Sequence, residues 1–390
     1  MDFEPLDTSD IDRWMGQPLG GEQLREPIAV SDLRRWVQAM HNPNPIHYDA
    51  DWPAVREAGG LIAPQSLILA CSIRHGVQTS VQGTFPGVNQ MNGGDAWWFY
   101  ETAAVGDLVK SVRTALDYRI TDTPFAGPTI FQRGLITYVN QHGEVLARQR
   151  STSIRYLQAN FRKAAEARPK KAVSDADAEA AKAGPRLTPE MVAGYEAERL
   201  AYARSLREAS PPTLADVTEG MRLPSRIIGP HSVQSFTTEQ RAFLYTIWGN
   251  LYDDGLPRTE RRNVRWEEGA IDPYFTDGLY HGHSAGHTNS EAAASRGMPR
   301  AYGAGASACA FIVDYAANWA GRTGTVEHVD VQYRSPILVG DVTYITATVK
   351  SVGVADASGA GPVTLAVQAV DQNGKASTPG TVIVRLPARR

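Results

Sequence analysis

The sequence predicts an α+β protein built from two copies of one unit, in which an apolar helix precedes and packs against an antiparallel sheet. Two turns recur in the same order: Val-Gly-Asp at residues 105–107 and 339–341, and Gln-x-Gly at residues 141–143 and 372–374. In both halves, segments with strand character flank the turns and an apolar helical segment comes before them. Ordered recurrence of this kind is typical of a duplicated structural unit.

The first half is expected to begin with a helix at residues 28–39, capped by Ser31. Asn-Pro-Asn-Pro follows at residues 42–45. Because proline has no N–H and forces the preceding residue into extended geometry, this stretch is a rigid loop, and it carries His47. The apolar run at residues 61–73 is expected to form a buried helix. Strands are expected within residues 96–102, 108–116, 129–139 and 144–156.

A charged segment separates the two halves. Between residues 158 and 216 the composition changes to Ala, Glu, Lys and Arg, with Pro at the edges. This favours a largely helical, solvated linker without chemistry, between an N-terminal domain at 1–157 and a C-terminal domain at 217–390. In the second domain the apolar helix is expected at residues 304–319, after a loop inserted at 251–286.

Composition limits the classes of partner and compartment. A formal net charge of −3 over 390 residues argues against nucleic acid or an anionic membrane as partner. No stretch approaches the roughly 18 apolar residues of a membrane span, and the N-terminus lacks the basic and apolar regions of a signal peptide. Cys71 and Cys309 both lie in apolar runs, which predicts two buried thiols rather than a disulfide. A cytoplasmic location is therefore expected.

The rigid His47 loop lies just before a predicted helix start. The segment from Ala63 to Ser66 has the character of a first helical turn, whose unpaired N–H groups can face a carbonyl oxygen or an anion. A fixed imidazole beside such donors suits acid/base chemistry on a polarised carbonyl.

The loop resembles a known family motif. His41-Asn-Pro-Asn-Pro-Ile-His47 is similar to the (R)-specific enoyl-CoA hydratase motif of the MaoC-like hot-dog superfamily, Gly-Asp-x-Asn-Pro-(Leu/Ile/Val)-His. A related pattern runs from His287 to Gly297 in the second half. The resemblance covers about residues 28–157 and 225–387. It implies a double hot-dog fold in which each half wraps one long helix in an antiparallel sheet, the two halves packing side by side as a pseudo-dimer.

The resemblance also implies the chemistry. It predicts reversible hydration of a 2-enoyl-CoA with a bulky or branched acyl group, without a cofactor and with the coenzyme A thioester as substrate. His47 and His287 are the implied catalytic histidines, and homodimers or higher oligomers stay open. The implied substrate-binding residues, including the backbone N–H groups at both helix starts, are Asn44, Gln65, Ser66, Gly305 and Ala306.

The motif departs from the family at one position. Where the family has an aspartate that shares water and protons with the histidine, this chain has Asn42 in the first half and Gly282 in the second. An amide can orient a water molecule but cannot take its proton at neutral pH. Either another carboxylate substitutes, of which Asp49 is the nearest in sequence, or the first site is not a hydratase site. An acyl-CoA thioesterase and a catalytically silent acyl-CoA-binding subunit are the alternative functions.

The inserted loop offers a second set of candidates. It contains His281 and His283 shortly before His287, together with Asp272 and Asp277. One interpretation is an acid/base site in which His287 works with His283 or an aspartate. A loop that merely covers the substrate is the alternative, and His-x-His without a helical or strand scaffold is too weak a signal to assign a metal.

Overall fold

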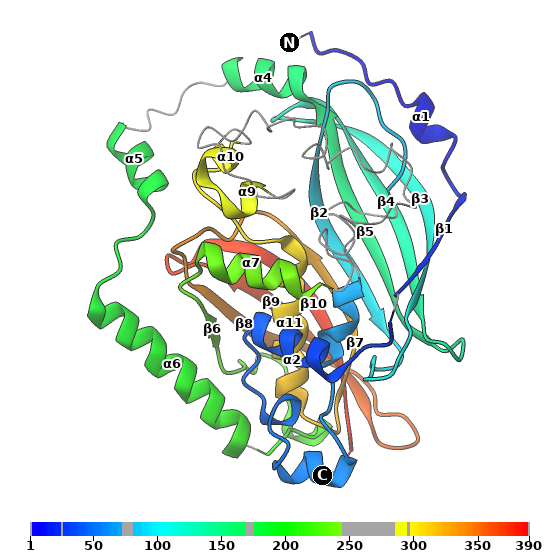
Figure 1. Cartoon of the computed structure of the whole chain (residues 1–390), viewed down its shortest axis with the longest axis vertical. Helices are drawn as coiled ribbons and strands as arrows, with labels where there is room; N and C mark the ends of the chain where they lie inside the picture. Colours follow the sequence, from blue (N-terminus) through cyan, green and yellow to red (C-terminus); the bar gives the residue numbers. More distant parts are fainter. Residues whose placement is uncertain are drawn as a thin grey trace.

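The computed structural model describes residues 2–24, 26–71, 81–167, 175–208, 210–243, 285–294 and 297–388. Its strands form one continuous sheet in the order β1-β3-β4-β5-β2-β7-β10-β9-β8-β6, and all of the pairings between these strands are antiparallel. Figure 1 shows the sheet curving around the helices. The strands are β1 (Pro18–Gln23), β2 (Val88–Phe99), β3 (Lys110–Thr123), β4 (Gly127–Val139), β5 (Val145–Leu157), β6 (Arg226–Ile228), β7 (Thr325–Gln332), β8 (Thr343–Val352), β9 (Gly361–Val370) and β10 (Ala376–Leu386).

The two halves share this sheet through one strand pair. Strand β2 of the first half pairs with β7 of the second, from Gly94 opposite Gln332 to Trp98 opposite His328. Each half therefore contributes its own antiparallel strands to a common sheet. The predicted α+β class and side-by-side duplication are confirmed.

The recurring turns make the same hydrogen bond in both halves. The Gln141 side-chain oxygen accepts from the backbone N–H of Leu108 at 2.8 Å, and the Gln372 oxygen accepts from Val342 N–H at 2.9 Å. The glycines of the two Val-Gly-Asp turns have φ of 98° and 90°, which only glycine adopts readily. A glutamine from one turn thus ties down the strand that begins after the other.

The central helix of the second half is α11 (Gly305–Ala320), which is buried nearly all round and packs against β7 and β10. This confirms the predicted long helix. In the first half, the predicted helix is instead an irregular stretch at residues 61–64 followed by a short 3₁₀ helix, η2 (Gln65–Cys71), and residues 72–73 of the run lie outside the described residues. Helix η2 packs directly against α11, and both cysteines are buried free thiols as expected.

Helices from the two halves pack against each other. Helix α2 (Val30–Ala39) packs against α7 (Val233–Ala242), with the rings of Trp36 and Phe243 5.2 Å apart in an edge contact. The predicted cap at Ser31 is wrong, because the Asp32 carboxylate accepts from Ala29 N–H at 2.9 Å and the helix starts earlier. The short helices are α1 (Ser9–Asp12), η1 (Pro45–His47), α3 (Pro53–Ala58), α9 (Ala285–Thr288) and α10 (Ser290–Ala294).

The charged segment between the halves is helical. It contains α4 (Gln158–Ala167), α5 (Asp175–Ala183), α6 (Pro189–Glu208) and η3 (Leu214–Asp216). It is not solvated throughout, however. Helix α6 lies along β6 (Figure 1), buries the Tyr202 ring and donates a hydrogen bond from Arg199 to the Gly229 carbonyl. Within the described residues, no helix is both long and apolar enough to span a membrane.

Candidate active site

The His47 loop is rigid, as its prolines predict. Pro45 occupies the first position of η1, where a missing N–H carries no penalty, and the Asn44 side-chain oxygen accepts from Ile46 N–H at 3.3 Å to cap that turn. The turn holds His47 in the interior, with only 5% of the residue exposed. Local sequence therefore determines the turn that carries this imidazole.

One hydrogen bond determines which nitrogen of His47 is available. Its Nδ1 lies 2.6 Å from the carbonyl oxygen of Ile62. Because a carbonyl only accepts, Nδ1 carries the proton and Nε2 keeps its lone pair. Burial lowers the pKa of His47 to about 4, against the opposing effect of this hydrogen bond. At neutral pH the ring is therefore uncharged and can act as a base.

His47 lines a cavity of about 360 Å³ between the two halves. The first half contributes the His47 loop, the approach to η2 and a short segment before β3. The second half contributes one face of α11 and the segment that follows it. The residues that line the cavity are Asn42, Asn44, Ile46, His47, Leu61, Ile62, Ala63, Pro64, Gln65, Thr102, Ala103, Ala104, Asp314, Ala317, Asn318, Gly321, Arg322, Gly324 and Thr325.

Three amides join the halves at this cavity. Asn318 of α11 donates to the Asn42 side-chain oxygen at 3.1 Å, and Asn44 donates to the Asn318 oxygen at 2.9 Å. Asn42 also accepts from Asn44 N–H at 3.1 Å, so its oxygen is fully engaged. Its buried Nδ2 has two hydrogens, and one of them can point to a nearby carboxylate, that of Asp314. With the other hydrogen, Asn42 can still donate to a ligand or a water molecule.

The sequence interpretation missed Asp314, which lies on α11 in the same cavity wall. Only 1% of the residue is exposed, and the side chains of Ser66 and Asn42 lie within hydrogen-bonding reach of its carboxylate. Burial raises the pKa of Asp314 to about 6, although Arg226, Ser66 and Asn42 oppose the shift. A single aspartate inside an otherwise apolar helix was the signal that could have identified it.

The predicted substrate-binding residues fall in different places. Gln65 lines the cavity, and its side chain pairs with the backbone of Val326, accepting at 2.8 Å and donating at 3.2 Å. Ser66 is buried behind the wall, where its oxygen accepts from Trp36 Nε1 at 2.9 Å. Gly305 packs on the Tyr333 ring and Ala306 is buried; neither belongs to this cavity wall. Of the two predicted helix starts, only the one at Gln65 shares a cavity with His47, whereas the one at Gly305 does not.

Of the remaining candidates, the two that the structure describes, His287 and Asp49, do not line this cavity. His287, on α9, places its Nδ1 2.5 Å from the Tyr302 carbonyl oxygen. His283, like the rest of the inserted loop before residue 285, lies outside the described residues. Asp49 is not the substitute carboxylate, because it accepts from Asp51 N–H at 3.0 Å in a turn and is not part of the cavity wall. Within the described ranges, no three His, Cys, Asp or Glu side chains are placed to hold a metal ion.

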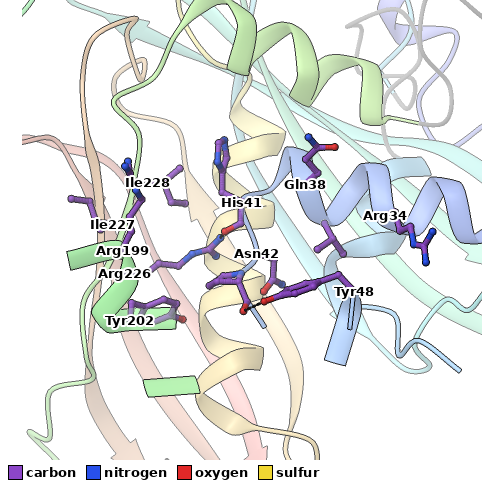
Figure 2. Close-up of a pocket in the computed structure, with 12 residues that line it drawn as sticks. Arg34, Gln38, His41, Asn42, Tyr48, Arg199, Tyr202, Arg226, Ile227 and Ile228 are labelled. Carbon is purple, nitrogen blue, oxygen red and sulfur yellow. Dashed lines mark hydrogen bonds between the residues drawn. The ribbon is translucent and has the colours of Figure 1, made fainter. Parts of the chain in front are cut away.

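A second cavity of similar volume lies on the other side of the loop at residues 41–43. Figure 2 shows Arg226 and Arg199 reaching it from the side of β6 and α6. The Arg226 guanidinium donates to the carbonyl oxygens of Met40 at 2.7 Å, His41 at 3.0 Å and Phe311 at 3.0 Å. It thereby ties α11 to the start of the His47 loop. This contact between the halves holds one wall of the first cavity against the other.

One family model matches part of the first half. Residues 13–149, which include His47, match the family described as "FAS1-like, dehydratase domain region". A protein described as a probable enoyl-CoA hydratase alpha subunit of Thermomonospora curvata is 26% identical over 170 residues, covering 40% of this chain and 52% of that protein. The chain thus spans about half the length of this curated relative.

Solved structures match the whole chain. A MaoC-like dehydratase has a TM-score of 0.59 at 16% identity, over 97% of this chain and 100% of that one. A conserved hypothetical protein of Mycobacterium tuberculosis, described as having a double hotdog fold, has a TM-score of 0.53 at 14% identity, over 95% of this chain and 96% of that one. A MaoC-like dehydratase of Phytophthora capsici has a TM-score of 0.52 at 9% identity over 97% and 98%. At these identities the likeness shows the fold. The chain has the double hot-dog fold, and residues 13–149 of its first half are similar to a FAS1-like dehydratase region.

Proposed function

We propose that this protein catalyses the reversible addition of water to a 2-enoyl-CoA in the cavity between its halves. The observation that carries the proposal is the anchoring of His47 through Nδ1, which leaves an uncharged Nε2 as a base in that cavity. The FAS1-like dehydratase region spans this residue. The relative from Thermomonospora curvata supports a coenzyme A thioester as substrate.

The geometry suggests how the thioester would lie. Its carbonyl oxygen would face the N–H groups at the start of η2, around Gln65, which would stabilise the enolate that forms during the reaction. The C3 atom would then lie near the water held by His47 and Asn42. His47 would take a proton from this water as its oxygen attacks C3, and the Asn42 amide would orient the water.

The acyl group would extend along the apolar part of the cavity. That part consists of Ile46, Leu61, Ile62, Ala63, Ala103 and Ala104. The volume of about 360 Å³ lies at the lower end of the usual range for small-molecule sites, while both halves supply its walls. Because the cavity is at the lower end of that range, a compact branched acyl group is the substrate we propose for this space.

Hydrolysis of an acyl-CoA is a second candidate, and one observation favours it. Asp314 presents a buried carboxylate to the same cavity, where it could activate water for attack on the thioester carbonyl. The products differ: hydrolysis releases a free thiol, whereas hydration leaves the thioester intact.

The test is to follow both reactions on a panel of straight and branched 2-enoyl-CoA esters. Hydration removes the ultraviolet absorbance of the conjugated thioester without producing thiol, and this is the expected result. Thiol appearing at the rate of substrate loss would establish the thioesterase instead. Binding of the esters, measured by calorimetry, with neither reaction would show a silent binding subunit and overturn the proposal.

A further inference from the structure

The proposed reaction needs an acid as well as a base. Water contributes its oxygen and one hydrogen to C3, while C2 must receive a proton from another group. The position where the family motif has an aspartate is Asn42, and an amide cannot supply a proton at neutral pH. Among the described residues that line the cavity, Asp314 is the one carboxylate.

We propose that Asp314, on the central helix of the second half, is the catalytic acid of the first-half site. The inference rests on the proposed function and deepens it. It makes the site composite: the base comes from a loop of one half and the acid from the helix of the other. The two halves must then stay joined for the reaction to proceed.

The burial of Asp314 supports a functional role rather than a stabilising one. Its side chain sits in an apolar helix, between Val313 and Tyr315, where Arg226, Ser66 and Asn42 only partly offset the burial of the carboxylate. A buried carboxyl that its neighbours stabilise only in part costs stability, so it is not explained by the fold. Asn42 lines the same cavity. Both groups are therefore available to a ligand that occupies the space.

The surroundings of Asp314 and His47 suit one as an acid and the other as a base. Arg226 opposes the rise in the pKa of Asp314, which burial brings to about 6, so the carboxyl holds a proton in about a tenth of the molecules at pH 7. The lowered pKa of His47 makes it a base under the same conditions. Two groups whose environments move their pKa values in opposite directions are typical of an acid/base pair.

The proton balance closes with these two groups. His47 Nε2 takes one proton from water as the oxygen bonds to C3, and the C2–C3 π electrons move towards C2 and the thioester carbonyl. The protonated Asp314 then gives its proton to C2, which completes the hydroxyacyl product. The enzyme is left with an imidazolium and a carboxylate, and transfer of the proton between them, through solvent, restores both. Dehydration is the reverse.

The experiment compares Asp314→Asn with wild type on an ester that wild type hydrates. We expect kcat to fall about 10²- to 10⁴-fold with KM changed less than about threefold, since the carboxyl acts in the chemical step. Glu239→Gln is the matched control, because Glu239 is also buried but lies on α7, outside this cavity. Its kcat should stay within about twofold of wild type.

A second variant moves the carboxylate back to the motif position. Asn42→Asp in the Asp314→Asn background keeps an oxygen for the Asn318 hydrogen bond and supplies a new acid at the cavity. We expect it to recover kcat at least about tenfold over Asp314→Asn. A purely structural role of Asp314 would give no such recovery.

The outcomes separate the two proposals. Hydration by wild type with undiminished kcat in Asp314→Asn overturns the role of Asp314 and leaves the function standing. Absence of hydration by wild type on the whole panel overturns the function, and the acid role with it. Should Asp314→Asn not fold by near-ultraviolet circular dichroism, Asp314→Ala is made instead. Failure of both to fold would show that Asp314 is structural and overturn the inference.

Discussion

The ring of His287 is anchored in the same way as the ring of His47. In each case Nδ1 lies next to the carbonyl oxygen fifteen residues further on, at 2.5 Å from Tyr302 and 2.6 Å from Ile62. The duplicated unit therefore repeats the geometry of its histidine. The surroundings differ, because His47 shares a cavity with a buried carboxylate from the other half, Asp314.

This difference predicts which histidine works. His47→Ala should lower kcat for enoyl-CoA hydration about 10²- to 10⁴-fold, because it removes the base from the cavity. His287→Ala should change kcat less than about threefold. The measurement is the initial rate of loss of the conjugated thioester absorbance, with exposed His142→Ala as the control. A larger effect of His287→Ala than of His47→Ala would place the chemistry in the second half.

The stability of the protein should depend on pH through Glu239. Burial raises the pKa of this carboxyl to about 8, despite the opposing effect of Ser307, whereas the unfolded chain releases the proton near 4.5. The native state then binds more protons than the unfolded state between these values, so the free energy of unfolding falls as pH rises from 4.5 to 8. Glu239→Gln should lack about 3 kcal/mol of this fall. Urea unfolding at pH 5 and pH 8 measures this difference. An equal fall in the free energy of unfolding of wild type and Glu239→Gln would contradict a raised pKa for Glu239.

The guanidinium of Arg226 should be a major structural contact between the halves. It is 1% exposed and bonds three backbone carbonyls of α11 and the His47 loop. Arg226→Met keeps much of the side-chain volume but leaves these acceptors unpaired, so the free energy of unfolding should fall by about 3 kcal/mol or more. Urea unfolding at neutral pH tests this. In the control Arg35→Met, loss of the exposed pair with Asp32 should change stability by less than about 1 kcal/mol.

Two positions in the segment between the halves should respond differently to substitution. Tyr202 is 9% exposed on α6, whereas Lys182 on α5 is exposed and pairs with Glu179 at 2.8 Å. Tyr202→Ala should therefore reduce the free energy of unfolding by about 3 kcal/mol, and Lys182→Ala by less than about 0.5 kcal/mol. Turnover of Lys182→Ala should stay within about twofold of wild type. Equal stability losses would mean that α6 is not packed as the structure shows.

Much of this protein follows from local sequence. Strand alternation, the recurring Val-Gly-Asp and Gln-x-Gly turns, and the prolines around His47 act over a few residues, because they depend on backbone sterics and side-chain period. The duplicated sheet, the buried thiols and the rigid His47 loop could therefore be predicted. The solvated character of α6 was predicted wrongly, since its polar composition does not reveal that Tyr202 packs inward against the second half.

Tertiary structure alone decided how the candidate site is assembled. Asp314 lies in an apolar helix of the second half, and nothing in its neighbouring residues relates it to His47 or Asn42 of the first. The pairing of β2 with β7 and the hydrogen bonds of Arg226 bring these segments together. Sequence periodicity reports which side of a helix is buried, but not which group it meets across an interface formed by residues far apart in the chain. For that physical reason, the sequence determined where the histidine is held, and only the packed halves determined which carboxylate faces its cavity.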